Sequence, residues 1–153
     1  MLAYEVYIPY TVSGDLKRER ERMKIVQVLP RIYLSREQLE ASVTFYESLF
    51  GERSRVRFPY PEAGLELAQV GSLLLIAGEA AALEPFKATQ ATFLVDSLSE
   101  WKDFLLKSGA TLLQEPKQVP TGMNMLAKHP DGTRIEYVQH VKEQVDAVNL
   151  TRK

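Results

Sequence analysis

One order of secondary-structure elements occurs twice along this chain, and the repeat constrains the fold more than any other feature. Apolar spacing and turn residues predict, in each copy, a strand, then a helix, then three short strands. The first copy comprises residues 26–34, 35–51, 54–60, 65–70 and 72–77, and the second comprises residues 91–96, 97–109, 111–119, 123–128 and 133–139. The sequence therefore predicts an α+β fold built from two βαβββ modules.

Both predicted helices carry the same start and stop signals. Each begins at a serine with Gln or Glu three residues later, which is typical of a capping box, and each ends at a glycine. These residues are Ser35, Gln38 and Gly51 in the first helix, and Ser97, Glu100 and Gly109 in the second. In the first helix, Leu39, Val43, Tyr46 and Phe50 form one apolar stripe.

The two copies also align residue by residue. Leu39 and Leu98 lie 59 positions apart, and so do Phe45 and Phe104. Two apolar matches are weak support alone, so the shared order of elements carries the interpretation as an internal repeat. Within the first strand, Pro30 predicts a sheet edge or a bulge, because proline cannot donate a hydrogen bond to a neighbouring strand.

Length and composition favour one soluble globular domain. The 153 residues are 45% hydrophobic and 25% charged, which is ordinary for such a domain. A net charge of -1 argues against nucleic acid or an anionic membrane as a partner. Cysteine is absent, which excludes disulfides, thiolate catalysis and zinc–thiolate sites.

Residues 1–22 differ from the rest and predict an N-terminal extension. Tyr4, Val6, Ile8 and Tyr10 alternate as in a half-buried strand, and residues 13–24 form a mixed-charge run typical of a solvated helix or linker. We expect the first module at residues 23–84 and the second, with a C-terminal tail, at 85–153, residues 23–140 forming one domain. No basic leader or apolar run of about 18–20 residues occurs, so we expect a cytoplasmic protein.

Several of these motifs together resemble one superfamily. The helix REQLEASVTFYESLFG, the doubled βαβββ order and the late HPDGTRIEYV are similar to the glyoxalase/bleomycin resistance/extradiol dioxygenase proteins, also called vicinal oxygen chelate proteins. The resemblance covers about residues 26–140. It implies a curled mixed sheet around a cavity, with helices on the outside. It also implies either a divalent metal held by His, Gln or Glu side chains from four strands, or a metal-free site that binds a small molecule.

The resemblance places the four metal-ligand positions on residues of this chain. The first falls on Arg31 and its counterpart in the second module on Gln90, again 59 positions apart. Another falls on Glu136. The remaining position lies in residues 72–77, where we expect the same strand face to hold Leu73, Leu75 and Ala77, none of which can bind a metal.

Arg31 argues against a metal at this place. Its guanidinium has no lone pair to donate and stays charged, so it would repel a divalent cation. Only Glu136 and, weakly, Gln90 remain as ligands, whereas catalytic metal sites usually need three or more. Of the two histidines, His129 precedes the turn at residues 130–132, and His140 lies about 13 Å from Glu136 along the strand, at about 3.3 Å per residue. We therefore expect no metal and no other cofactor.

Strand alternation instead predicts a polar-lined pocket. Arg31 and Tyr33 share one strand face, Gln90 shares a face with Thr92, and Glu136 lies on the matching face of the last strand. We expect these five residues to line the pocket, with Arg31 and Glu136 paired because an unpaired buried charge is costly. Two interpretations stay open: the pair merely neutralises a lost metal site, or Arg31 binds an anionic or carbonyl-bearing ligand that Glu136 or Gln90 orients.

Aromatic residues outside this set favour packing roles. Trp101 shares a helix side with Leu98 and Leu105, which predicts a core or dimer contact. Phe58 and Tyr60 share one strand face and suit packing better than ligand contact.

The sequence thus predicts a metal-free small-molecule-binding protein of the glyoxalase/bleomycin resistance type, forming a homodimer, with no nucleic-acid or membrane partner. The alternative is a metal-dependent lyase, isomerase or dioxygenase of the same superfamily. A purely structural module with a filled cavity is a third possibility, since fold does not fix function.

Overall fold

The computed structural model describes residues 14–150, with only the backbone for residue 150; the strand expected at residues 4–10 lies outside this range. The helices are α1 (Gly14–Glu21), α2 (Leu39–Phe50), α3 (Ala80–Leu83), α4 (Leu98–Lys107) and α5 (Lys142–Leu150), with short 3-10 turns η1 (Arg36–Gln38), η2 (Pro61–Ala63) and η3 (Glu84–Phe86). The strands are β1 (Ile25–Leu34), β2 (Val56–Tyr60), β3 (Leu65–Val70), β4 (Leu73–Gly78), β5 (Ala91–Val95), β6 (Thr111–Val119), β7 (Gly122–Lys128) and β8 (Arg134–His140). The doubled βαβββ order is confirmed.

The predicted helix signals are present. The Ser35 backbone N–H donates to Oε1 of Gln38 at 3.0 Å, and α2 follows the short turn η1. Gly51 ends α2 in the left-handed region, at a φ of 67°. The Ser97 hydroxyl accepts from the Glu100 backbone N–H at the start of α4, at 3.4 Å. Local sequence thus determines where both long helices begin.

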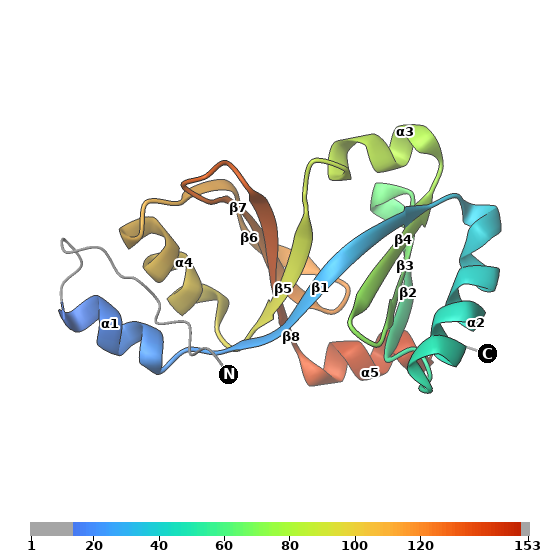
Figure 1. The fold of residues 1–153 in the computed structure, drawn as a ribbon, viewed down its shortest axis with the longest axis horizontal. Helices are drawn as coiled ribbons and strands as arrows, with labels where there is room; N and C mark the ends of the chain where they lie inside the picture. The colour runs from blue at the N-terminus through green and yellow to red at the C-terminus, as the bar shows by residue number, and fades with distance from the viewer. Residues whose placement is uncertain (1–13, 151–153) are drawn as a thin grey trace.

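All eight strands form one curled mixed sheet in the order β2-β3-β4-β1-β5-β8-β7-β6 (Figure 1). Each module contributes a four-stranded half. The two halves meet at β1 and β5, which run antiparallel, whereas β1 pairs parallel with β4 and β5 pairs parallel with β8. The sheet is therefore mixed and has internal two-fold similarity.

Strand β1 joins the two halves, and this corrects the expectation from Pro30. Residues 25–30 of β1 pair with β5, and residues 31–34 pair with β4. Pro30 thus lies in a central strand and not at a sheet edge, and the bulge in β1 occurs earlier, between Ile25 and Gln27. Proline is tolerated because it occupies the point where β1 changes partner.

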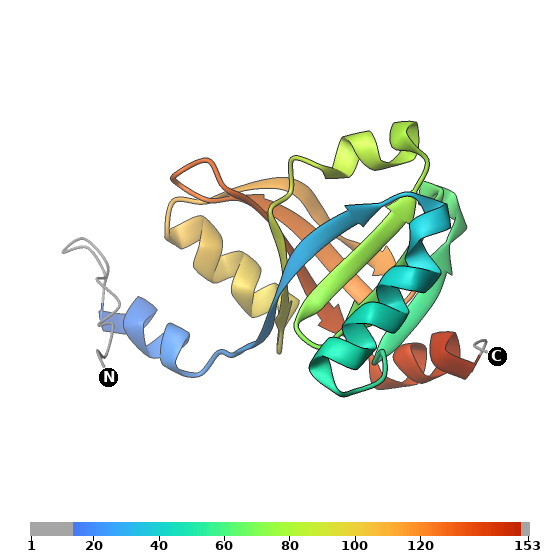
Figure 2. The same cartoon turned by 45° about the vertical axis from the view of Figure 1, so that its right-hand side comes forward.

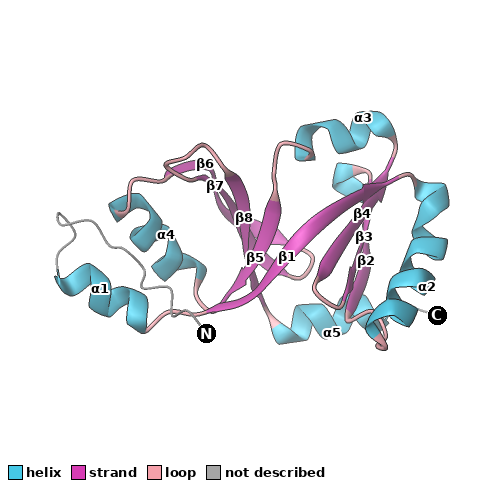
Figure 3. Ribbon diagram, viewed as in Figure 1, coloured by secondary structure: helices cyan, strands magenta, loops and turns pink. Residues whose placement is uncertain are grey.

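The long helices pack on the outer, convex side of the sheet (Figures 2 and 3). Helix α2 buries Leu39 and Val43 against Ala68, Val70, Leu75 and Ala77 of the first module. Helix α4 buries Trp101 and Leu105 against the second module, which confirms a core position for Trp101. Burial of these apolar faces, at about 25 cal/mol per Å², is the main force that fixes each helix to its half.

The inner side of the sheet has its own apolar cluster, to which both modules contribute. Its strand residues include Leu29, Leu74 and Ile76 from the first module, and Leu94 and Val138 from the second. The expectation for residues 72–77 was therefore wrong in register: Leu73, Leu75 and Ala77 face the outer helix. Leu74 pairs with Arg31 and Ile76 with Tyr33, so the inner face of β4 is still unable to bind a metal.

Three parts of the structure were predicted loosely or not at all. The charged run near residue 20 forms α1, which buries Leu16 and is tied to α4 by an ion pair between Glu19 and Lys107. Helix α3 is part of the link between β4 and β5, and α5 forms where a tail was expected. Within residues 14–150, no helix is long and apolar enough to cross a bilayer.

Helix α5 leaves the end of β8 in the second module and crosses to β2, the edge strand of the first (Figure 1). There the Asn149 side-chain amide donates to the Arg55 carbonyl at 2.9 Å and accepts from the Arg57 N–H at 3.3 Å. One side chain thus takes the place of a neighbouring strand along β2. We call this contact the α5 clasp.

Candidate functional site

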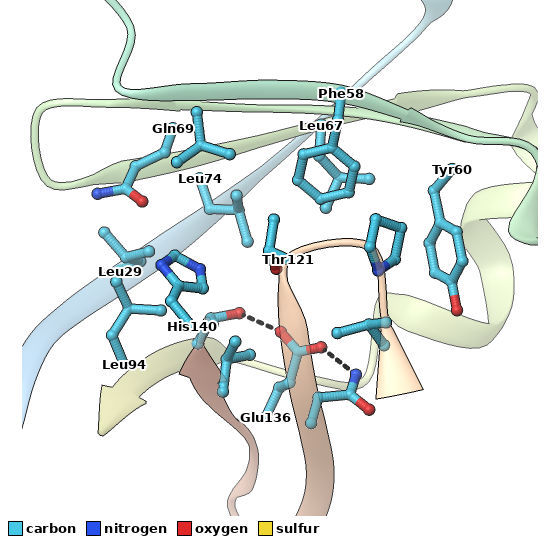
Figure 4. Close-up of a pocket in the computed structure, with 16 residues that line it drawn as sticks. Leu29, Phe58, Tyr60, Leu67, Gln69, Leu74, Leu94, Thr121, Glu136 and His140 are labelled. Carbon is cyan, nitrogen blue, oxygen red and sulfur yellow. Dashed lines mark hydrogen bonds between the residues drawn. The ribbon is translucent and has the colours of Figure 1, made fainter. Parts of the chain in front are cut away.

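The curl of the sheet encloses a hollow with two connected compartments. The inner chamber, of about 70 Å³, is mainly apolar and is drawn in Figure 4. The outer chamber, of about 670 Å³, has a more polar lining that includes Arg31, Gln114, Lys117 and Gln118. Four residues line both compartments: Tyr60, Leu67, Asn124 and Glu136. The hollow is therefore built by both modules, and Glu136 lies where its two parts join.

Arg31 is held at this junction by three different partners. Its Nε donates to the Thr92 hydroxyl at 3.1 Å, Nη1 to the Tyr33 hydroxyl at 3.2 Å, and Nη2 to Glu136 Oε1 at 3.0 Å. Its side chain is only 5% exposed, so the guanidinium has exchanged water for these partners. The predicted pairing of Arg31 and Glu136 is confirmed.

The Glu136 carboxylate accepts hydrogen bonds from three side chains of the sheet. Oε1 takes the Arg31 bond and a second bond from the Thr92 hydroxyl at 2.8 Å, and Oε2 accepts from the Asn124 amide at 2.7 Å. Strand register produces this arrangement, because Thr92 is directly opposite Glu136 across the β5–β8 pair. Gln114 in turn donates to the Asn124 side-chain oxygen at 3.0 Å. The carboxylate is 20% exposed and remains accessible from the hollow.

Four of the five predicted pocket residues are brought together, and the fifth is not. Arg31, Tyr33, Thr92 and Glu136 form one hydrogen-bonded cluster, in which the Tyr33 hydroxyl also lies 3.0 Å from the Thr89 carbonyl. Gln90 is exposed and precedes β5. Its side-chain oxygen accepts from the Arg134 N–H at 2.9 Å, so it extends the β5–β8 pairing instead of joining the cluster.

Most residues that line the hollow were not predicted, among them Phe58, Tyr60, Asn124 and His140. Strand alternation could have found Asn124, because it shares the inner face of β7 with Leu126, which is opposite Glu136. Phe58 and Tyr60 line the inner chamber, although their spacing favoured packing. His140, the last residue of β8, lines the inner chamber.

The pKa values of two groups in the hollow are shifted. Burial lowers the pKa of His140, and the nearby Glu136 carboxylate opposes this shift only in part. Burial raises the pKa of Tyr60, and the carboxylates of Glu62 and Glu136 raise it further. Near pH 7, the hollow therefore contains a neutral imidazole and a neutral phenol.

His129 lies apart from the hollow. Its Nε2 is 2.7 Å from the Tyr137 hydroxyl, on the side of the sheet that packs against α4, and burial lowers its pKa. Burial also raises the pKa of Tyr137. This pair belongs to the outer core and has no contact with Glu136.

The described residues do not fit a metal. Between residues 14 and 150 no three His, Asp or Glu side chains come together as a ligand group. At the position implied for a metal, the Arg31 guanidinium is 3.0 Å from the Glu136 carboxylate. A divalent cation there would have to displace a buried, paired positive charge.

No protein-family profile and no curated protein match the chain. A crystal structure of an uncharacterized protein from Methanosarcina mazei is 50% identical, with a TM-score of 0.72, over 78% of this chain and 95% of the other. The chain belongs to the same family as that protein.

Structures with lower sequence identity identify the fold. Methylmalonyl-CoA epimerase from Mycobacterium tuberculosis is 16% identical, with a TM-score of 0.55 over 76% of this chain and 89% of its own. A Streptomyces coelicolor methylmalonyl-CoA epimerase variant in complex with 2-nitronate-propionyl-CoA is 18% identical, with a TM-score of 0.55 over 75% and 95%. The chain therefore has the vicinal oxygen chelate fold.

Proposed function

We propose that this vicinal oxygen chelate protein is a metal-free small-molecule-binding protein of the glyoxalase/bleomycin resistance type. The observation that carries the proposal is the Arg31–Thr92–Glu136–Asn124 network at the junction of two open compartments. An outer chamber of about 670 Å³ is within the usual range of ligand pockets, roughly 300–1,000 Å³. The polar network fixes a few hydrogen-bonding atoms in an otherwise apolar lining, which is the usual composition of such sites.

Within this proposal, Arg31 orients and Glu136 contacts the ligand. The guanidinium is almost fully buried and uses all three of its nitrogens on protein partners, whereas the carboxylate lines both chambers. Arg31 also fixes the position of the Glu136 carboxylate, because its Nη2 donates to Oε1 at 3.0 Å. The proposed pocket does not include Gln90, because its side chain is bound to the Arg134 backbone.

We also propose a homodimer, formed by the outer side of the first module. Several large apolar side chains remain exposed there, on the outer face of β1 and on α2: Val26 at 65%, Val28 at 46%, Phe45 at 60% and Leu49 at 63%. We call these four residues the outer patch. Large exposed apolar areas on a soluble protein commonly mark a contact with another protein.

A thermal-shift screen of small organic molecules tests the binding function. A ligand at 100 times its dissociation constant should stabilise the native protein by about 2.7 kcal/mol. The substitution Leu67→Trp fills the junction and should abolish the shift, whereas Leu113→Trp on the exposed face of β6 should not. Ligands that stabilise the Leu67→Trp protein equally would place binding elsewhere and refute the proposal.

Metal analysis separates this function from that of a metal-dependent lyase, isomerase or dioxygenase. After growth in metal-supplemented medium, the purified protein should contain far less than one divalent ion per chain. One ion per chain that is lost on Glu136→Ala would overturn the metal-free proposal in favour of the enzyme.

A further inference from the structure

The His140 imidazole lines the inner chamber without a hydrogen-bond partner among the described residues. Thr92, Asn124 and Glu136 are bound to one another or to Arg31, and Gln69 donates to Gln27. Neither ring nitrogen of His140 makes a hydrogen bond with any residue from 14 to 150. Figure 4 shows the imidazole among Leu29, Leu74 and Leu94.

Two hydroxyl groups of the chamber share this property. Those of Tyr60 and Thr121 also have no partner within the described chain, and both residues line the inner chamber. These polar atoms are not among the fully buried, unbonded atoms of the described residues, so water reaches them, and an occupant of the chamber could take over its hydrogen bonds.

The charge state of His140 determines what it can bind. Its pKa is lowered by burial, so at pH 7 the ring is neutral and offers one N–H donor and one lone-pair acceptor. The best complement to such a ring is a group that both accepts and donates, such as a hydroxyl or a primary amide. A carboxylate can only accept, and an ammonium can only donate.

The charges around the chamber disfavour an ionic group. Glu136 is its carboxylate, and Arg31, which neutralises that charge, is already bound to it at 3.0 Å. A ligand carboxylate would lie near Glu136 with no unpaired cation beside it in the inner chamber. Lys117, which has no ion-pair partner among the described residues, lines the outer chamber instead. A ligand ammonium would lose its hydration and gain only apolar contacts and the Glu136 carboxylate, whose charge Arg31 already neutralises.

Size limits how much of a ligand can enter. The inner chamber measures about 70 Å³, less than half of an engineered cavity of about 150 Å³ that binds benzene. It therefore suits a short branched group and not a ring system. The outer chamber, almost ten times larger, has room for the rest of the molecule.

We propose that the inner chamber binds the uncharged, hydroxyl- or amide-bearing end of an organic ligand, that His140 recognises this end, and that the bulk of the ligand occupies the outer chamber. This inference rests on the proposed binding function and adds the ligand class and a specificity residue.

The test uses a set of small probes of one shape and different charge. These are 2-methylpropanol, 2-methylpropanamide, 2-methylpropanoate and 2-methylpropylammonium, titrated at pH 7.5 up to about 100 mM because ligands of this size bind weakly. NMR follows the ring nitrogens of His140, those of His129 as an internal control, and the Ile76 methyl groups, which report on the outer chamber. The alcohol and amide should shift His140 saturably and bind at least about tenfold more tightly than either ion, while His129 stays unchanged.

Variants separate recognition from packing. His140→Phe keeps a ring but removes both nitrogens and should weaken the alcohol and amide about tenfold. His140→Gln retains a donor and an acceptor and should restore part of the affinity, and His129→Gln should have no effect.

Equal binding of 2-methylpropanoate, or unchanged alcohol binding by His140→Phe, would overturn the inference. Shifts at Ile76 without any at His140 would also overturn it, while leaving the binding function intact. If no probe shifts either reporter, the inference fails, and the proposed function then fails only if the thermal-shift screen is negative as well.

Discussion

Arg31 determines the chemistry of the hollow more than any other single residue. Its guanidinium binds Thr92, Tyr33 and Glu136 simultaneously, at a position where the family resemblance implies a metal ligand. A buried ion pair of this kind contributes little net stability relative to apolar residues, but removing one partner leaves a costly unpaired charge. The pair is therefore better understood as fixing the position of a carboxylate than as a source of stability.

This interpretation predicts a strongly non-additive mutational cycle. Arg31→Met and Glu136→Gln should each lower the free energy of unfolding by about 3 kcal/mol, because each leaves the other group buried without its charge partner. The double variant should lose clearly less than the sum, with a coupling of at least about 1 kcal/mol in urea denaturation. Strictly additive losses would mean that the two side chains are stabilised independently.

Both partners of the pair could be predicted from sequence, but their surroundings could not. The family resemblance places Arg31 and Glu136 at the site, and strand alternation adds Tyr33 and Thr92 on the same faces; the structure brings these four together. Alternation also gives Gln90 the inner face of β5, but Gln90 precedes the strand, where its side chain can reach the Arg134 backbone. Side-chain choices at strand ends depend on neighbouring backbone that no spacing pattern specifies.

At the scale of elements, helices α2 and α4 were predictable and α5 was not. The capping residues and glycine stops of α2 and α4 are local signals, and the repeat places one helix at the same point of each module. Helix α5 follows the second module and has no counterpart in the first, so the repeat gives no information about it. The face of β4 was assigned wrongly because its residues are apolar on both sides, which removes the alternation that sets register.

The α5 clasp can be tested at Asn149. Asn149→Ala removes both hydrogen bonds to β2 and should lower the free energy of unfolding by about 1 to 2 kcal/mol. Amide exchange at Arg57 should accelerate, because its N–H loses its partner. Asn149→Asp is the matched control: it can still accept from the Arg57 N–H but cannot donate to the Arg55 carbonyl, so exchange there should change less. Unchanged exchange in Asn149→Ala would show that the helix covers β2 without this side chain.

At the scale of the whole molecule, the outer patch is the feature that the fold leaves without a partner. Val26 and Val28 belong to β1 and Leu49 to α2, and all three are exposed. Apolar surface contributes about 25 cal/mol for each Å² removed from water, so covering the patch favours association. The inner hollow needs no second copy, because both of its walls come from one chain.

We therefore expect Leu49→Glu to convert a dimer into a monomer in sedimentation velocity experiments, because a charge would be buried at the contact. Leu113→Glu introduces the same charge on β6, away from the patch, and should leave the dimer intact. A wild-type protein that sediments as a monomer at high micromolar concentration would contradict the homodimer.

The partner change within β1 has a mechanical consequence. One continuous backbone belongs to both halves of the sheet, and the exchange takes place at a proline, whose φ angle is fixed near -65°. The two walls of the hollow are thus coupled by a stiff joint instead of a loose linker, while the α5 clasp bridges them at a second place. We expect the molecule to respond to a bound ligand by a small twist of β1, and not by a large movement of the two halves of the sheet away from each other.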